Sequence, residues 1–295
     1  ANGVETRDAT PGKESVGGFV GARIVIVAAS AIESARLLLN SPGAGGKGSV
    51  GNGSGLVGKN LTFSTFSQVE GSLPYASHEK RVEGFRIPLP FLGRSVWDQY
   101  YDEKAAVEVR KSGMLNLGFI HPNPIFQAER VASRGAEMLW GADLKKALKH
   151  HFNDATHLEV ETFGEYFPNA GTFVTPDPDV KDRFGIPVAR VHVEHHPRNG
   201  LIARRLADAS EKLLNAMDAV DVKTRIPHGE TSVLQHGTCR AGTDPAASVL
   251  NADCRSHEVT NLYVTDGSFM PTSGGAPTTL TILANAFRVA KKIAV

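Results

Sequence analysis

The sequence predicts a mixed fold, with an α/β part built from both ends of the chain and an α+β part of antiparallel strands inserted between them. Three observations support this prediction. Residues 22–40 have the pattern of a buried strand, a turn and a helix, and residues 261–293 repeat that order. The region between them contains short segments that alternate between apolar and polar residues, as antiparallel strands do.

The first strand–helix unit starts at Ala22–Ala29, which is short, β-branched and apolar on both faces. These properties are typical of a parallel strand that is buried on both sides. Residues 31–40 follow with apolar side chains on one helical face. We expect Ser30 to cap this helix and Glu33 to complete a capping box.

The middle of the chain is predicted to combine an antiparallel sheet with helices. Residues 124–152 have a helical pattern, and residues 200–219 have the pattern of an amphipathic helix. The clearest strand candidates are Thr62–Val69, Met114–Ile120, His157–Phe163 and Pro187–His195.

The second strand–helix unit begins with Asn261–Asp266, a predicted strand that ends in an acidic residue. A turn rich in Gly, Pro and Ser follows, and Pro277 is expected to open a long helix that runs to about Ile293. Proline is favoured at the first helical position because its missing N–H would have no partner there.

Composition excludes several classes of protein. The 295 residues include 32 Lys and Arg against 31 Asp and Glu, so no basic surface for nucleic acid is indicated. No apolar run approaches the roughly 20 residues that a membrane-spanning helix needs. The only cysteines, Cys239 and Cys254, are expected to be small buried residues.

One apparent motif has the wrong context. Gly53–Gly58 matches the GxGxxG pattern of dinucleotide-binding loops. That chemistry requires a buried strand before the loop and a helix after it, so that backbone N–H groups meet the pyrophosphate. Here Gly- and Ser-rich residues precede the motif and a non-helical stretch follows it, so we expect a loop without this function.

Two blocks of sequence resemble the glucose–methanol–choline (GMC) oxidoreductases, and a weaker match lies between them. The first block is Ile24–Leu39 with Ser54–Leu61. The second is Gly237–Pro245, Ser248–Leu250, Asn261–Ser268, Pro271–Gly275 and Thr279–Ile282, and the weaker match is Pro178–Arg190.

The resemblance implies a partial FAD-binding Rossmann-like domain with an inserted substrate domain, a six-stranded antiparallel sheet with helices. The expected boundaries are 1–60 and 226–295 for the two FAD-binding segments and 61–225 for the substrate-binding domain. The family's N-terminal FAD fingerprint is expected to precede residue 1. A second polypeptide that carries this segment is therefore one expected partner.

The resemblance also implies the reaction: FAD-dependent oxidation of a CH–OH group in a sugar, polyol or alcohol by hydride transfer to flavin N5. A dehydrogenase is expected rather than an oxidase, and the electron acceptor stays open. Two alternatives remain, a non-oxidative flavoprotein lyase on the same scaffold and a non-catalytic subunit that needs a partner chain to bind FAD.

The expected cofactor contacts follow from the second block. Asp266 ends a strand at the sheet edge where α/β folds bind ligands, and Gly275 lets the backbone approach a flat ring closely. The helix opened by Pro277 would present free N–H groups and a positive dipole end to a reduced flavin. The predicted cofactor-binding residues are Asp266, Gly267, Gly275, Pro277, Thr278 and Thr279.

The expected catalytic base is His236. In the family a His three residues before the Gly-Thr-Cys triplet takes the alcohol proton, but Leu234 occupies that position here and His236 stands directly before Gly237. The family's partner position, a His or Asn, corresponds to Pro277. A neutral imidazole suits proton abstraction because its ordinary pKa is about 6.5.

Other readings of the histidines stay open. The base could instead be His195, His196 or His228, or the chain could be catalytically impaired. No metal site is predicted, because adjacent residues of a strand, such as His195 and His196, point to opposite faces and no further ligands cluster nearby.

Overall fold

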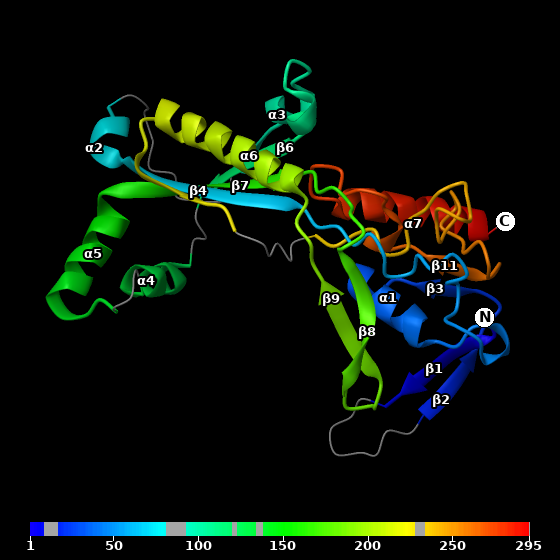
Figure 1. The fold of residues 1–295 in the computed structure, drawn as a ribbon. Helices are drawn as coiled ribbons and strands as arrows, with labels where there is room; N and C mark the ends of the chain where they lie inside the picture. Colours follow the sequence, from blue (N-terminus) through cyan, green and yellow to red (C-terminus); the bar gives the residue numbers. More distant parts are fainter. Residues whose placement is uncertain (9–16, 81–92, 120–122, 134–137, 228–233, 295) are drawn as a thin grey trace. The chain divides into compact units, whose positions relative to one another are not determined.

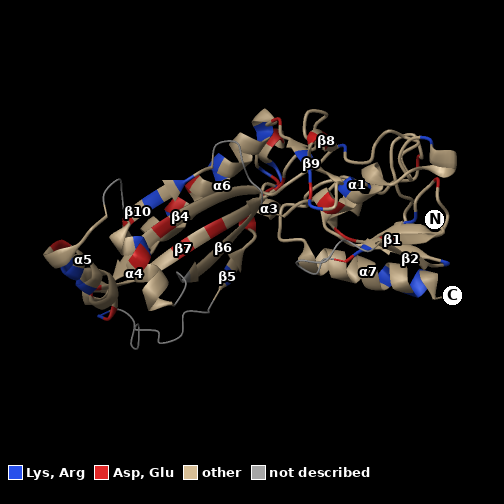
Figure 2. Ribbon diagram, turned by 90° about the horizontal axis from the view of Figure 1, so that it is seen from below, with Lys and Arg blue, Asp and Glu red and all other residues tan. Residues whose placement is uncertain are grey.

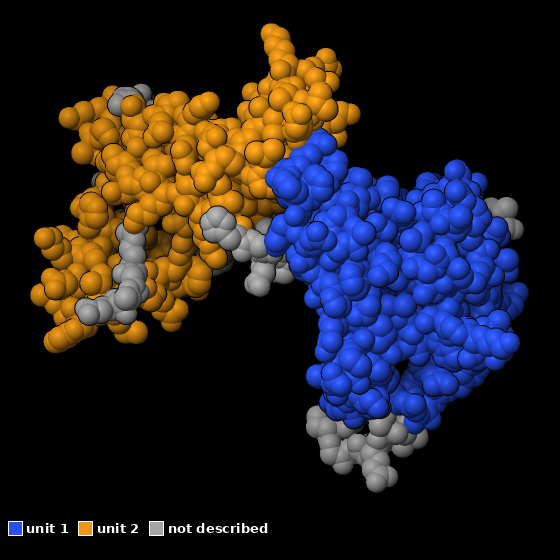
Figure 3. All heavy atoms as spheres, viewed as in Figure 1, with its two compact units in different colours: residues 1–64, 165–199, 229–295 blue, residues 65–164, 200–228 orange. Residues whose placement is uncertain are grey.

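The computed structural model describes residues 1–8, 17–80, 93–119, 123–133, 138–227 and 234–294 (Figure 1). The chain divides into two compact units, coloured separately in Figure 3: unit 1 is residues 1–64, 165–199 and 229–295, and unit 2 is residues 65–164 and 200–228. The predicted domains 1–60, 61–225 and 226–295 remain a prediction. In the structure, residues 165–199 belong to unit 1, which also contains both chain ends.

Unit 1 is built on a short parallel pair of strands from opposite ends of the chain. Strand β3 (Val25–Val27) pairs with β11 (Leu262–Val264), and helices α1 (Ala31–Asn40) and α7 (Thr279–Ile293) follow them in sequence. Apolar side chains of all four elements meet in one core, because each strand and helix buries one apolar face. Two strand–helix units are therefore present where the sequence predicted them.

The starts of both helices differ from the prediction. Ser30 has a left-handed φ of 76° and does not cap α1; its hydroxyl instead donates to Oε1 of Gln235 at 3.2 Å. Glu33 pairs with Arg36 at 3.0 Å, so no capping box forms. Pro277 lies before the N-cap residue Thr278, and α7 begins at Thr279.

Two antiparallel hairpins complete unit 1: β1 (Gly3–Arg7) with β2 (Gly17–Gly21), and β8 (Phe173–Lys181) with β9 (Pro187–His192). The second hairpin packs on α1, where Arg36 donates to Pro187 O at 2.7 Å and pairs with Asp182 at 2.6 Å. Short 3-10 turns cover Ala44–Gly46 and Gly267–Phe269. Both cysteines are free and buried, as expected.

Unit 2 is an antiparallel sheet with strand order β10-β4-β7-β6-β5. The family resemblance implied six strands, and the described residues form five. The strands are β4 (Thr65–Pro74), β5 (Arg94–Val96), β6 (Gly113–Phe119), β7 (Ala155–Gly164) and β10 (Val220–Arg225).

The helices of unit 2 correct one prediction, because residues 124–152 are not a single helix. They form α4 (Pro124–Ala132) and α5 (Gly141–Asn153), and Gly141 starts the second helix with a left-handed φ of 63°. None of the helices in the described ranges is long and apolar enough to cross a membrane. The remaining helices are α2 (Tyr75–His78), α3 (Asp98–Tyr101), a 3-10 turn at Val107–Val109 and α6 (Pro197–Ala216).

The core of unit 2 lies between the sheet and α6. Along β4 every second residue is buried, so one face of the sheet is dry. Leu206 and Leu214 of α6 are fully buried against this face. The opposite face carries carboxylates of β4 and β7, drawn red in Figure 2.

We expect Gly164→Ala to destabilise the protein by about 1–3 kcal/mol, the usual cost of overpacking a core. The added methyl would lie against the Thr65 hydroxyl, 2.8 Å from Ile202 Cγ2 and 2.9 Å from Leu206 Cδ1. Gly118→Ala is the matched control, since beyond its chain neighbours no atom of a described residue lies within 4 Å of the added methyl. Urea denaturation of both variants measures the difference, and equal stabilities would contradict this packing.

Candidate active site

His236 is held in the interior of unit 1 by its backbone. Its N–H donates to Thr62 O at 2.9 Å, and the N–H of Thr62 donates to His236 O at 2.9 Å. The side chain is only 1% exposed. Its Nε2 lies 2.7 Å from the Thr278 hydroxyl, whereas Nδ1 is buried without a hydrogen-bond partner among the described residues.

Burial sets the charge of this ring. Desolvation lowers the pKa of His236 to about 4, because a dry surrounding penalises the imidazolium. The ring is therefore neutral near neutral pH, as a general base must be. With Nε2 engaged by Thr278, the free ring position is Nδ1, a polar atom that a bound molecule could satisfy.

Gly267 brings the turn after β11 next to His236. A Cβ on Gly267 would lie 2.6 Å from Gln235 O and 3.4 Å from His236 Cδ2, so a larger residue would displace the segment that carries the imidazole. Backbone hydrogen bonds join the same segments, with Gly237 N donating to Gly267 O at 3.2 Å. Close packing against Gln235 and His236 therefore explains why a glycine occupies position 267.

Asp266 connects this turn to α1. One carboxylate oxygen accepts from Ser268 N at 2.8 Å and caps Gly267–Phe269, and the other accepts from the Ser34 hydroxyl. Burial, together with the negative charge of Asp266, raises the pKa of the Cys239 thiol. Asp266 thus fixes the backbone at the end of β11 by charge-assisted hydrogen bonds.

The loop before α7 contains two glycines with positive φ and is held by a hydrogen bond from the backbone of Tyr166. Gly274 and Gly275 have left-handed φ values of 77° and 66°, which residues with a Cβ rarely adopt. Tyr166 N donates to Ser273 Oγ at 2.7 Å. Burial raises the pKa of the neighbouring Glu165 carboxyl, although contacts with the backbone N–H groups of Ser273 and Gly274 oppose this shift.

The structure brings some of the predicted residues together and leaves others apart. His236 contacts Thr278, and Gly267 approaches the same ring; Asp266 and Gly275 are buried in the adjoining turns. Pro277 and Thr279 are exposed at the start of α7, and the hydrogen bond of the His236 ring is with Thr278, which lies between them.

These residues fit a flat, electron-rich ring. The hydroxyl of Thr278 does not cap α7, which leaves first-turn N–H groups and the positive end of the helix dipole for a ligand. The unpartnered Nδ1 of His236 and the tight turn at Gly267 lie next to this helix start. The N–H groups at this helix start are donors that an anionic reduced flavin would require, whereas the neutral Nδ1 is available as an acceptor.

The other histidines considered as the catalytic base are less suitably placed than His236. His195 and His196 are exposed and follow β9, so the expectation that they belong to a strand is wrong. His228 lies outside the described residues. Within the described ranges, no group of three or more His, Cys, Asp or Glu residues could hold a metal ion.

Sequence reasoning missed several neighbours of the predicted site. Ser34 holds Asp266 from α1, Thr62 pairs with the backbone of His236, and Glu165 braces the loop before α7. All three act across long sequence separations, so no local pattern points to them. The pairing of β3 with β11 and the bridge between Thr62 and His236 bring the first two contacts together, and the hydrogen bond from Tyr166 N to Ser273 places Glu165 beside the loop.

Comparison with known proteins shows which family part of the chain resembles. The GMC oxidoreductase family model matches residues 168–286. This match agrees with the family resemblance found in the sequence. The match of the family model includes neither the first strand–helix unit nor the last residues of α7.

Several relatives match nearly the whole chain, and two of them illustrate the range of names. Paromamine 6'-oxidase of Streptomyces fradiae is 34% identical over 93% of this chain and 46% of its own length. The 2-methyl-1,2-propanediol dehydrogenase of Mycolicibacterium austroafricanum is 32% identical over 91% of this chain and 47% of its own length. The chain therefore spans about half the length of the curated relatives it matches.

Solved structures share the fold of this chain. Pyridoxine 4-oxidase from Mesorbium loti superposes with a TM-score of 0.53 at 16% identity, covering 94% of this chain and 52% of that one. Formate oxidase of Aspergillus oryzae RIB40 superposes with a TM-score of 0.56 at 17% identity, covering 98% and 56%. At such low identities the likeness concerns the fold alone.

We expect the free energy of unfolding to fall as the pH is lowered from about 6.5 toward about 4. The His236 imidazole has a folded pKa of about 4 and an unfolded pKa of about 6.5, so protons favour the unfolded chain in this window. The full effect is on the order of 3 kcal/mol. His236→Gln should remove this part of the pH dependence in denaturation curves.

His195→Gln, which changes an exposed histidine, is the control for that measurement. It should leave the pH dependence of stability close to that of the unmodified chain. An unchanged slope in His236→Gln would mean that the imidazole is not buried in its neutral form.

Proposed function

We propose that the protein is an FAD-dependent oxidoreductase that oxidises a CH–OH group of an alcohol, polyol or sugar, with His236 as the general base. The observation that carries this proposal is the buried, neutral imidazole of His236, which Thr278 holds at the N-terminus of α7 while Nδ1 stays unpartnered. The match of residues 168–286 to the GMC oxidoreductase family model supports the proposed cofactor and the bond that reacts.

Each residue then has a defined task. Thr278 fixes the ring through Nε2, so that Nδ1 accepts the hydroxyl proton of the substrate. Asp266 and Gly267 hold the turn that bounds the ring, and Gly275 lets the loop before α7 approach the cofactor. When bound, FAD supplies the acceptor for the hydride that leaves the same carbon, so the alcohol becomes a carbonyl compound.

The low pKa of His236 is compatible with this task. An imidazole with a pKa of about 4 binds a proton weakly in the dry interior. Negative charge close to the ring favours the imidazolium and raises its pKa. We therefore expect His236 to become an effective base only when an electron-rich cofactor and the substrate are in place, since proton transfer then accompanies the loss of hydride.

The substrate class rests on the relatives. Their names refer to paromamine and to 2-methyl-1,2-propanediol, which makes a small hydroxylated molecule the proposed substrate. One of these relatives is named an oxidase and the other a dehydrogenase. We retain the expectation of a dehydrogenase with a separate electron acceptor, which activity with an artificial acceptor but not with oxygen would support.

A further polypeptide segment is part of the proposal, because unit 1 carries an uncovered apolar face. On α7, Leu280, Leu283 and Phe287, which are spaced three and four residues apart on one side of the helix, are 78%, 52% and 71% exposed. Large exposed apolar side chains in such a group are typical of surfaces that another segment covers. This observation favours a segment, on this or a second polypeptide, that completes the FAD-binding domain.

Anaerobic flavin reduction tests the proposed function. The purified, flavin-containing protein is mixed with polyols, diols and sugars in the absence of oxygen, and the visible flavin absorbance is recorded. We expect at least one of these compounds to bleach the absorbance and to yield a carbonyl product.

Product formed without bleaching would instead support the non-oxidative lyase. A protein that has no flavin when intact mass shows this chain alone, but gains it with a polypeptide carrying the nucleotide-binding segment, would support the subunit hypothesis. A flavin-loaded protein that neither bleaches nor forms product with any compound would contradict both enzymatic proposals.

A further inference from the structure

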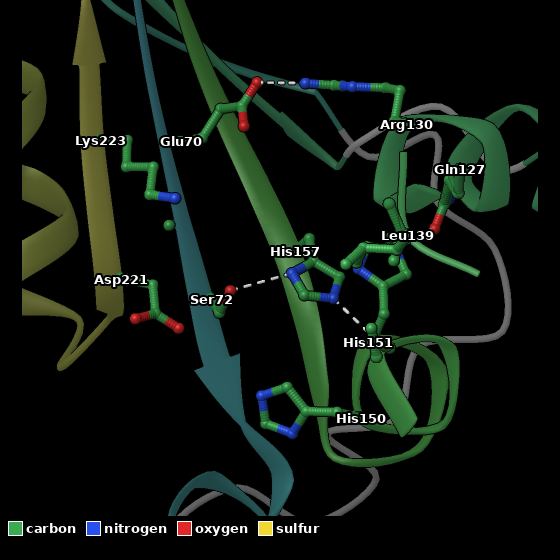
Figure 4. A pocket seen from close by; sticks show the side chains of 13 residues that line it. Glu70, Ser72, Gln127, Arg130, Leu139, His150, His151, His157, Asp221 and Lys223 are labelled. Atoms are coloured by element: carbon green, nitrogen blue, oxygen red, sulfur yellow. Dashed lines mark hydrogen bonds and ion pairs between the residues drawn. The ribbon is translucent and has the colours of Figure 1, made fainter. Parts of the chain in front are cut away.

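A cavity of about 480 Å³ lies entirely within unit 2 (Figure 4). Strands β4, β7 and β10 contribute residues to it, and so do helices α4 and α5. Its volume is within the roughly 300–1,000 Å³ of typical small-molecule sites. The cavity contains none of the residues assigned above to the flavin and the proton transfer.

Two histidines in the cavity have fixed orientations. His157 Nε2 donates to His151 O at 2.9 Å, so its Nδ1 accepts from the Ser72 hydroxyl at 2.9 Å. The rings of His151 and His157 stack 3.8 Å apart at an interplanar angle of 7°. His151 Nε2 also meets Gln127 Oε1 at 2.8 Å. The stacked rings of His151 and His157 are therefore held in position without a ligand.

Two charged groups that line the cavity, Lys223 and Asp221, lack partners among the residues that the structure describes. Lys223 lies opposite Glu70 in the register of β10 and β4. The Glu70 carboxylate, however, forms its ion pair with Arg130 of α4, at 2.5 Å. Asp221 lies at a register shift in β10 and has a left-handed φ of 54°. Such irregularities re-aim side chains, and Figure 4 shows both Asp221 and Lys223 directed toward the cavity.

Neither the Lys223 ammonium nor the Asp221 carboxylate forms a hydrogen bond or ion pair with another described residue. Both are therefore available to a ligand, one as a donor and the other as an acceptor.

The balance of charge selects the class of ligand. The cavity contains the cations Lys223 and Arg130 and the anions Asp221 and Glu70. An anionic ligand would face two carboxylates, and a cationic ligand would face two positive charges. A neutral hydroxyl group avoids both penalties, because it accepts from an ammonium and donates to a carboxylate.

The apolar part of the lining suits the carbon frame of such a molecule. Val131, Leu139 and Ala147 come from α4, the segment that follows it and α5, and the stacked imidazoles add a flat surface. A saturated ring that carries hydroxyl groups presents C–H faces to these side chains and hydroxyls to Asp221 and Lys223. We propose that this cavity is a binding site for a neutral polyhydroxylated ring, a monosaccharide or a cyclitol.

Saturation-transfer NMR titration of the full chain with methyl α-glucopyranoside and myo-inositol tests the site. The variants Asp221→Asn and Lys223→Met each remove one charge-assisted hydrogen bond. Asparagine is chosen because it tolerates the left-handed backbone of residue 221. We expect at least about a tenfold loss of affinity in each variant, which corresponds to one such bond.

Asp208→Asn and Lys212→Met, on exposed positions of α6, are the matched controls and should bind like the unmodified chain. Circular dichroism confirms that all four variants are folded. Inorganic phosphate and tetramethylammonium should not compete with the bound ring.

Three results would overturn the proposal: no binding of either ring, equal affinities in the cavity variants and the controls, or displacement by phosphate or tetramethylammonium. Binding that His236→Gln abolishes while the cavity variants retain it would also overturn it, since the ring would then occupy unit 1. Because titration follows binding rather than oxidation, the outcome does not depend on the proposed reaction.

Discussion

The parallel pairing of Val25–Val27 with Leu262–Val264 is the constraint on which the candidate active site depends. It joins elements from opposite ends of the chain and places Asp266 where the Ser34 hydroxyl of α1 can reach it. Asp266 in turn fixes the glycine turn that approaches His236. Loss of the strand pairing would therefore separate the base, the turn and the start of α7 together.

The second feature that gives the site its chemistry is the exclusion of water from His236. A solvated imidazole would titrate near its ordinary pKa, whereas burial keeps this ring neutral, and Nδ1 has no hydrogen-bond partner in the described part of the chain. An unsatisfied polar atom in a dry interior has an energetic cost. Such a cost is understandable where a bound molecule completes the hydrogen bonding, as active sites are organised for the liganded state.

The sequence predicted those parts of the structure that depend on local pattern. Both strand–helix units and the main strands of unit 2 were located correctly, because burial and alternation are local properties. The roles of Ser30 and Pro277 at helix starts were wrong, since tertiary contacts decided the backbone there. Asp221 and Lys223 could not be predicted to share a cavity, because this depends on the register of β10 and its irregularity.

The rate of anaerobic flavin reduction in His236→Gln tests the central claim most directly. Both this variant and the control His195→Gln should retain flavin, and the comparison is made at saturating alcohol by stopped-flow absorbance. Loss of the base should slow reduction by about 10²–10⁴-fold in His236→Gln, the usual contribution of a general base, and leave the control unchanged. Equal reduction rates in the two variants would contradict the assignment of His236 as the group that takes the substrate's proton.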